Sequence, residues 1–383
     1  MIKRALNAFG RSKRKSRSRP TIQNICGSDR NEEVIVMKQQ LQTTGKQRDP
    51  YFDNARFFLV TLVVLGHLIS PVREANDTLF FMNNFLSSFR MPALVLVSGF
   101  FTKHFSRDPR RFVKQLLLTL LVPYLVFQVF YLRMDGLAET WGQLAVNLFA
   151  PNFGMWFLLS LLFWNLLLFP FAKLRHPILV AFILGVVIGW VDAAGEFLSI
   201  SRTFVFFPIF LIGHHLQKGQ FSFFKERRAK GLAVVAIVLN ASILSFFSLE
   251  QARNALLARH PFVEIADSLL EGTVLRLVFY VVMLLGIVAF LPWVPKKRIS
   301  TTYLGRRTAY VYLLHLFFVK LFTALNWFPE QLGLSFILIL PVVWLSIVYW
   351  TSSNAVVFFT RPFVEGKWPQ WSRQSPLVMR RNP

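Results

Sequence analysis

Long apolar stretches recur along most of this chain, and they limit what it can fold into more than any other feature. A helix needs about 20 consecutive apolar residues to cross the hydrocarbon core of a bilayer, and it satisfies its backbone polar groups within the segment itself. With 54% of its 383 residues hydrophobic, the sequence predicts an all-α polytopic membrane protein with about ten transmembrane helices. The ten candidate spans are 55–72, 79–102, 112–132, 154–172, 177–192, 203–216, 231–249, 274–294, 305–326 and 333–359.

The connections between these spans alternate in charge. Four connections with net charges between +2 and +5 are residues 103–114, 173–175, 217–230 and 295–307. The slightly acidic connections between them are 73–77, 133–139, 192–202 and 250–276. Because cytoplasmic loops carry the excess of Lys and Arg, we expect both chain ends in the cytoplasm (N-in, C-in). This topology also accounts for the net charge of +24.

The chain ends outside the apolar region are basic. Residues 1–50 contain the run RSKRKSRSR but no apolar core after it, so no cleaved signal peptide is expected. We expect a disordered cytoplasmic tail at 1–50, a membrane domain at 51–360 and a short basic cytoplasmic tail at 361–383. Anionic lipid is a suitable neighbour for the first tail, and nucleic acid is not an expected partner. A single cysteine excludes an internal disulfide.

Ionisable side chains within predicted spans are costly and therefore mark functional sites. Arg56 lies at the cytoplasmic start of the first span, three residues after Asp53, so these two side chains can pair on one helix face. His67 follows Arg56 by eleven residues, which is about 16 Å along a helix and close to three full turns. Arg90 enters the second span from the outside and reaches a comparable depth, about 18 Å. His67 and Arg90 are therefore expected near mid-membrane, with no acidic residue close in either span.

Three further residues stand out in the later spans. His315 is expected at mid-depth in the ninth span, either in a hydrogen bond between helices or in a functional role. Trp156, near the outer start of the fourth span, is typical of an interfacial aromatic residue. Lys320 is expected to extend its charge outward to the interface.

Several short motifs, in this order and spacing, resemble the membrane acyltransferase-3 family, and most closely its fucose 4-O-acetylase-like branch. The resemblance covers about residues 50–360. The motifs are the segment from Asp53 to His67, FRMPALVLVSGFF from Phe89, RRFVKQLLLTLLVPY from Arg110, MWFLLSLLFW from Met155, FFPIFLIGHHLQK from Phe206 and LGRRTAYVYLLH from Leu304.

The resemblance implies transfer of an acyl group, expected to be acetyl, from cytoplasmic acyl-CoA to a hydroxyl of a cell-surface glycan or its lipid-linked precursor. It implies that Arg56 and His67 are site residues, and that the cytoplasmic cations Arg110, Arg111 and Lys114 bind the phosphates of CoA. The positive-inside rule alone also accounts for those three cations. One departure is Arg90, because the branch often has His at that position in the motif FHMP.

His67 is suited to act as general base toward a hydroxyl, because the ordinary pKa of histidine lies near neutrality. A transient acyl carrier is the alternative role. Arg56 and Arg90 would orient the thioester or stabilise its oxyanion. No metal and no tightly bound cofactor is expected, since nucleotide-binding and metal motifs are missing from the sequence. The competing class is a transporter or flippase for an anionic solute, with Arg90 as counter-ion, although no internal repeat supports it.

Overall fold

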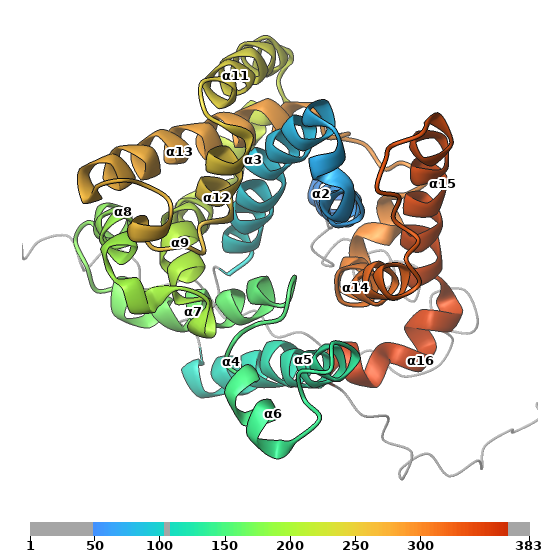
Figure 1. The fold of residues 1–383 in the computed structure, drawn as a ribbon. Coiled ribbons are helices and arrows are strands. Elements are labelled where there is room, and N and C mark those ends of the chain that lie inside the picture. Colours follow the sequence, from blue (N-terminus) through green and yellow to red (C-terminus); the bar gives the residue numbers. More distant parts are fainter. Residues whose placement is uncertain (1–48, 103–107, 367–383) are drawn as a thin grey trace, which may run out of the picture. The chain divides into compact units, whose positions relative to one another are not determined.

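The computed structural model describes residues 49–102 and 108–366, and every regular element in these ranges is helical (Figure 1). The expected tail at 1–50 and most of the one at 361–383 lie outside the described residues. Seven helical segments are long and apolar enough to cross a membrane. They are α2 (Pro50–Ile69) with η1 (Ser70–Ala75), α3 (Asp77–Phe100), α4 (Pro109–Leu116) with η2 (Leu117–Leu121) and α5 (Val122–Met134), η5 (Phe197–Ser199) with α9 (Ile200–His215), α11 (Arg227–Ser245), α13 (Leu269–Phe290) with η8 (Leu291–Trp293), and α15 (Leu334–Thr351).

Three shorter apolar helices complete the set that the sequence predicts. They are α7 (Trp156–Phe171), α8 (Pro177–Val187) with η3 (Ile188–Trp190), and α14 (Thr308–Ala324). Each of the ten expected spans coincides with one of these segments. The all-helical membrane fold is thus confirmed, with seven helices of spanning length in the described residues, while the number of ten crossings stays a prediction.

The remaining elements connect these helices. They are α6 (Trp141–Asn147), η4 (Asp192–Ala194), α10 (Lys218–Ser222), η6 (Phe223–Lys225), α12 (Leu249–Leu257), η7 (Phe262–Glu264), η9 (Thr302–Arg306) and α16 (Asn354–Glu365). The expected span 333–359 was too long, because α15 ends at Thr351 and a separate helix follows. The hydroxyl of Thr351 bonds back to the carbonyl of Ile347, and the hydroxyl of Ser353 caps α16 by accepting from Val356 N.

Helix α2 lies between α3 on one side and α14 and α15 on the other (Figure 1). Helix α3 also packs closely against α9. A methyl group at Gly99 would lie 2.1 Å from the carbonyl oxygen of Phe210, and one at Gly213 would lie 2.1 Å from that of Leu96. These two glycines let the backbones of α3 and α9 touch, as small residues do between membrane helices. The contact fixes α3 beside α9.

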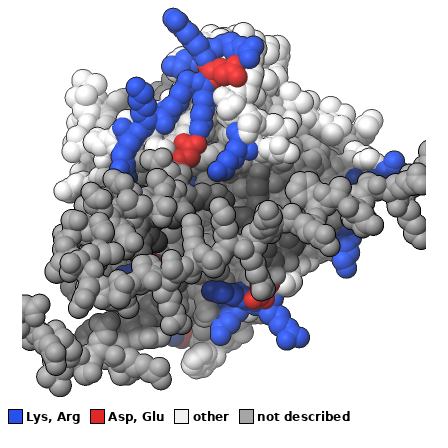
Figure 2. All heavy atoms as spheres, turned by 180° about the vertical axis from the view of Figure 1, so that it is seen from behind, with Lys and Arg blue, Asp and Glu red and all other residues white. Residues whose placement is uncertain are grey.

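Helices α11 and α15 lie at the periphery (Figure 1), and many of their apolar side chains are exposed. Val235, Val238, Leu338 and Val342 are each more than half exposed, as lipid-facing residues are. Exposed cations gather in the connections predicted to be cytoplasmic, including Lys218, Arg227, Arg228, Lys230, Lys296, Lys297 and Arg298. Figure 2, turned by 180° from Figure 1, shows many Lys and Arg and few Asp and Glu on that face.

Candidate active site

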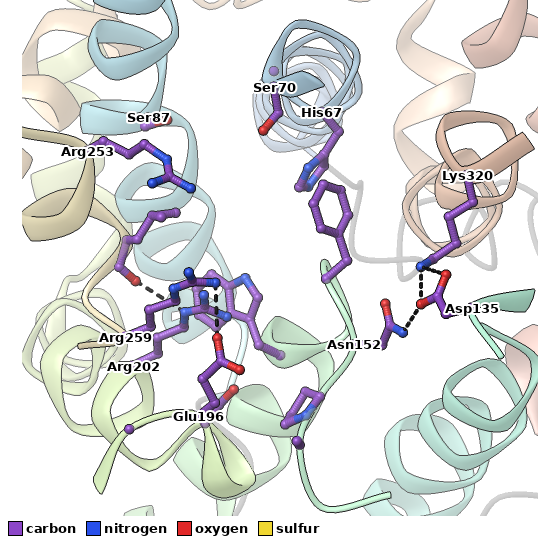
Figure 3. A pocket seen from close by; sticks show the side chains of 18 of the residues that line it. His67, Ser70, Ser87, Asp135, Asn152, Glu196, Arg202, Arg253, Arg259 and Lys320 are labelled. Atoms are coloured by element: carbon purple, nitrogen blue, oxygen red, sulfur yellow. Dashed lines mark hydrogen bonds and ion pairs between the residues drawn. The ribbon is translucent and has the colours of Figure 1, made fainter. Parts of the chain in front are cut away.

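A cavity of about 490 Å³ opens where the C-terminal end of α2 meets the N-terminal ends of α3, α7 and α9. We call it the arginine cavity. His67 projects into it from α2, with arginines on one side and Asp135 and Lys320 on the other (Figure 3). Its lining includes His67, Asn83, Arg90, Asp135, Asn152, Phe153, Trp156, Glu196, Arg202, Arg253, Arg259 and Lys320.

Arg90 lies directly against α2 beside His67. A methyl group at Gly66 would lie 1.2 Å from Arg90 Nη1, so the glycine provides the space for this guanidinium. Arg90 is only 8% exposed, and its Nη1 donates two long hydrogen bonds, of 3.5 Å to the carbonyl of Leu62 and 3.4 Å to Asn83 Oδ1. No carboxylate among the described residues pairs with it. Arg90 therefore retains capacity to bind an anionic or dipolar group.

His67 contacts two other rings. Its centroid is 4.6 Å from that of Phe153 and 5.3 Å from that of His315, which stacks on it at an interplanar angle of 29°. Phe153 has a φ of 39°, a left-handed conformation that costs a non-glycine residue energy. This backbone turn carries the Phe153 ring to the histidine. The rings of Phe153 and His315 hold His67 at the cavity wall.

His315 is fully buried directly behind His67. Its Nδ1 lies 2.9 Å from the carbonyl oxygen of Val311. Since a carbonyl only accepts hydrogen bonds, Nδ1 carries the proton, and Nε2 of the neutral ring is left as an acceptor. That Nε2 is buried and finds no hydrogen-bond partner in the described part of the chain. His315 therefore makes its hydrogen bond within α14, to Val311. The hydrogen bond between helices, one of its two expected roles, is not formed within the described residues, and the lone pair of Nε2 is free.

The arginines opposite His67 come from segments that the sequence indicated only as outer connections. Arg202 is 9% exposed, donates from Nε to the carbonyl of Leu257 at 3.2 Å, and lies 5.0 Å from the ring of Trp156. Arg259 pairs with Glu196 at 3.0 Å. Sequence reasoning missed this cluster because Arg202 and Arg259 lie in different connections and meet only through the fold.

One expectation about side chains at the membrane interface was wrong. Trp156 does not face the lipid. It is 9% exposed and stacks on Phe206 with centroids 5.5 Å apart, because α7 packs its first turn against α9. Lys320 extends toward the connection after α5 that is predicted to be outside. Its Nζ lies 2.6 Å from Asp135 in that connection, whose carboxylate also accepts from Asn152 Nδ2 at 2.5 Å.

Arg56 lines a second cavity, of about 380 Å³, which we call the Arg56 cavity. Its walls come from the N-terminal part of α2, the C-terminal end of α3, the start of the third span and the start of α14. The guanidinium of Arg56 lies 4.0 Å from the ring centroid of Phe101. Asp53, buried one turn earlier, lies 4.0 Å from Arg306 Nε. The structure therefore separates Arg56 from His67, one in each cavity.

The three cations expected to bind CoA lie on α4 and are exposed. Arg110, Arg111 and Lys114 precede Leu116, a residue that lines the Arg56 cavity at the end of the same helix. Asp108 precedes the helix, and its side chain caps it by accepting from Arg111 N at 3.1 Å. The cations thus lie within two turns of the Arg56 cavity along α4.

The acyltransferase domain model of the acyltransferase-3 family matches residues 49–351. The match spans α2 to the end of α15 and includes the whole lining of the arginine cavity and all of that of the Arg56 cavity except Val364. The chain belongs to the acyltransferase-3 family. Comparison with the curated proteins and with the solved structures finds no match.

Family and fold together make this chain a membrane acyltransferase. The site that such an enzyme needs must bring an acyl donor, an acceptor and a proton acceptor together. In this acyltransferase, the two cavities and His67 are the elements of the described structure that suit those tasks. The fucose 4-O-acetylase-like branch stays a prediction.

Proposed function

We propose that this membrane acyltransferase moves an acetyl group from cytoplasmic acetyl-CoA to a hydroxyl of a cell-surface glycan or its lipid-linked precursor. The enzyme would lie in a bacterial cytoplasmic membrane, with ten crossings and both chain ends inside. The exposed cations in four alternate connections support this orientation. It makes the Arg56 cavity the cytoplasmic one and the arginine cavity the outer one.

The observation that carries the proposal is the pair of cavities at opposite ends of α2. Arg56 lines the first and His67 the second, eleven residues or about 16 Å apart along one helix. A donor made in the cytoplasm and an acceptor at the outer face need two such entrances. Arg110, Arg111 and Lys114 would bind the phosphates of CoA at the cytoplasmic entrance, since Arg pairs with phosphate through two parallel hydrogen bonds.

His67 would act as general base. The acceptor hydroxyl attacks the thioester carbonyl, and this attack forms the new C–O bond. At the same time the hydroxyl proton passes to His67. The oxyanion that develops is stabilised by the guanidinium of Arg90 beside His67. Collapse of the intermediate breaks the C–S bond, and the CoA thiolate takes up the proton held by His67 as it leaves, which returns His67 to its neutral form. Arg56 would orient the donor from the cytoplasmic cavity.

The route between the cavities passes the rings of α14. Tyr312 lines the Arg56 cavity, and its ring centroid lies 6.1 Å from that of His315, which stacks on His67. The Tyr312 hydroxyl donates to the carbonyl of Gly154, next to Phe153. The thiol arm of CoA would reach His67 by displacing this Tyr312 contact.

The test follows release of CoA thiol from acetyl-CoA by the purified protein, with a cell-envelope extract as the acceptor mixture. We expect His67→Ala and Arg56→Ala each to abolish acceptor-dependent release. The exposed residues His176 and Arg228 provide matched controls, and His176→Ala and Arg228→Ala should retain the wild-type rate.

Three results would contradict the proposal in different ways. Wild-type release by a folded His67→Ala protein would remove His67 from the chemistry. Wild-type release by Arg56→Ala would remove the donor role of Arg56. No binding of acetyl-CoA and no turnover with any extract would favour the transporter of an anionic solute.

A further inference from the structure

We infer that the acceptor carries an anionic group, a phosphate or a carboxylate, and that Arg202, Arg253 and Arg259 bind it in the arginine cavity. This inference rests on the proposed function, because it names the class of acceptor that would reach His67. Nothing in the family match specifies the acceptor.

The charge of the cavity is the first argument. Five cationic side chains line it against two acidic ones. Both acids already have partners, since Asp135 pairs with Lys320 at 2.6 Å and Glu196 with Arg259 at 3.0 Å. Protein and lipid around the cavity lower the local dielectric constant. An unpaired buried charge costs free energy in such surroundings, so binding of an anionic ligand is favoured.

Arg202 provides the second argument, because its surroundings fix the guanidinium but leave its terminal nitrogens available. The ring of Trp156 lies 5.0 Å from it, and within the described residues its one hydrogen bond runs from Nε to the carbonyl of Leu257. The residue is 9% exposed, and no carboxylate of the described residues pairs with it. A guanidinium held in this way presents its two Nη groups to a planar or tetrahedral anion.

The placement of the cluster is the third argument. Arg253 and Arg259 come from α12 and the loop after it, and Arg202 comes from the start of α9. Figure 3 shows these three side chains on the wall facing His67, across the cavity. Arg253 pairs with Glu250 at 3.1 Å through Nη1. An anion bound at this wall would leave a neighbouring hydroxyl of the same acceptor to reach His67.

Two sources supply such an anion, the phosphate of a lipid carrier or an acidic group on the glycan. Three soluble probes distinguish them: inorganic pyrophosphate, glucuronate and glucose. The measurement is the thermal unfolding midpoint of the full-length protein in detergent as each probe is titrated. We expect at least one anionic probe to raise the midpoint and glucose to leave it unchanged. Pyrophosphate alone would indicate the lipid carrier, and glucuronate alone an acidic sugar.

The variants are Arg202→Gln and Arg253→Gln, with Arg228→Gln as a control of equal charge change at an exposed site on α11. We expect the first two to weaken binding of the anionic probe at least tenfold and the control to bind it like wild type. Arg253 is less buried than Arg202, so its variant keeps the test valid where Arg202→Gln does not fold. Undiminished binding by the folded variants, an equal effect of glucose, or no shift with either anion would overturn the inference.

Thiol release from acetyl-CoA, measured on the same preparations, separates the two proposals. Turnover without a binding site for either anion would leave the acyltransferase standing and remove the anionic acceptor. Anion binding that depends on Arg202 or Arg253, without any use of acetyl-CoA, would establish the site and overturn the proposed function.

Discussion

The two cavities that flank α2 differ in the chemistry of their walls. The arginine cavity is lined by charged and amide side chains from α3, α6, α9, α12, α14 and the connecting loops, and two arginines there are almost fully buried. The Arg56 cavity is mostly apolar, with Leu, Phe, Val and Pro around a single charged side chain. One helix therefore presents a cation to an apolar chamber at one end and a histidine to a polar chamber at the other.

This difference indicates what each chamber can hold. An apolar chamber suits an extended thioester arm whose charged phosphates stay outside, whereas a chamber with excess positive charge suits a polar acceptor. Each prediction below either separates the roles of the two chambers or links them through α2 and α14.

The first prediction concerns the side of the membrane on which each cavity opens, where the expected effect is all or none. In a Cys26→Ser background, Val263→Cys, at an exposed position of η7 four residues after Arg259, should react with a membrane-impermeant maleimide on intact cells. Lys297→Cys, in the connection beside Asn54 at the start of α2, should react only after the membrane is permeabilised. The reverse pattern would exchange the donor and acceptor roles of the cavities.

The next prediction separates the two ends of α2. His67→Gln should lower kcat by a factor of about 10² to 10⁴, the usual contribution of a general base, and leave acetyl-CoA binding intact. Arg56→Gln should weaken acetyl-CoA binding, which titration calorimetry measures. If both variants lose binding equally, the cavities do not divide donor from acceptor.

Gly66→Ala tests the placement of Arg90 beside His67. The added methyl group would overlap Arg90 Nη1, which must move. Because small misplacements near reacting atoms cost about 10²-fold in rate, we expect kcat to fall by about that factor. Gly231→Ala on α11 is the matched control, since no atom lies within 4 Å of its added methyl group. Equal rates for the two variants would show that the position of Arg90 does not matter.

His315→Phe removes both ring nitrogens and keeps a ring to stack on His67. We expect kcat to fall about tenfold, the smaller effect of a residue that positions the base, with the KM for acetyl-CoA unchanged. The variant loses the bond to Val311 but also removes the unpaired Nε2, so thermal stability should change little. Wild-type kcat in a folded variant would assign His315 to packing alone.

The smallest effect is expected at α4. Replacing Arg110, Arg111 and Lys114 singly by Gln should raise the KM for acetyl-CoA a few-fold without changing kcat, because exposed charges are screened by solvent. The KM of the wild type should rise with ionic strength, and the rise should be smaller in each variant. If the KM changes with neither ionic strength nor substitution, these cations have a role in topology only.

The sequence predicted the position of His67 and Arg90 better than the position of Arg56. Counting residues along the helices predicted that His67 and Arg90 lie at one depth, because a helix rises by a fixed distance per residue. The same counting placed Arg56 on the face of His67 and gave no sign that a wall of rings separates their cavities. Tyr312 was missed altogether, since tyrosine within an apolar run carries no distinguishing pattern.

The sequence by itself determined that this chain is helical and membrane-embedded, because apolar length and backbone hydrogen bonding leave few alternatives in lipid. Tertiary structure alone decided which cations meet. Arg202 and Arg253 are 51 positions apart and come together only because α12 folds back over α3 beside α9. Contacts between distant segments depend on helix packing, and a local pattern of residues does not encode that packing.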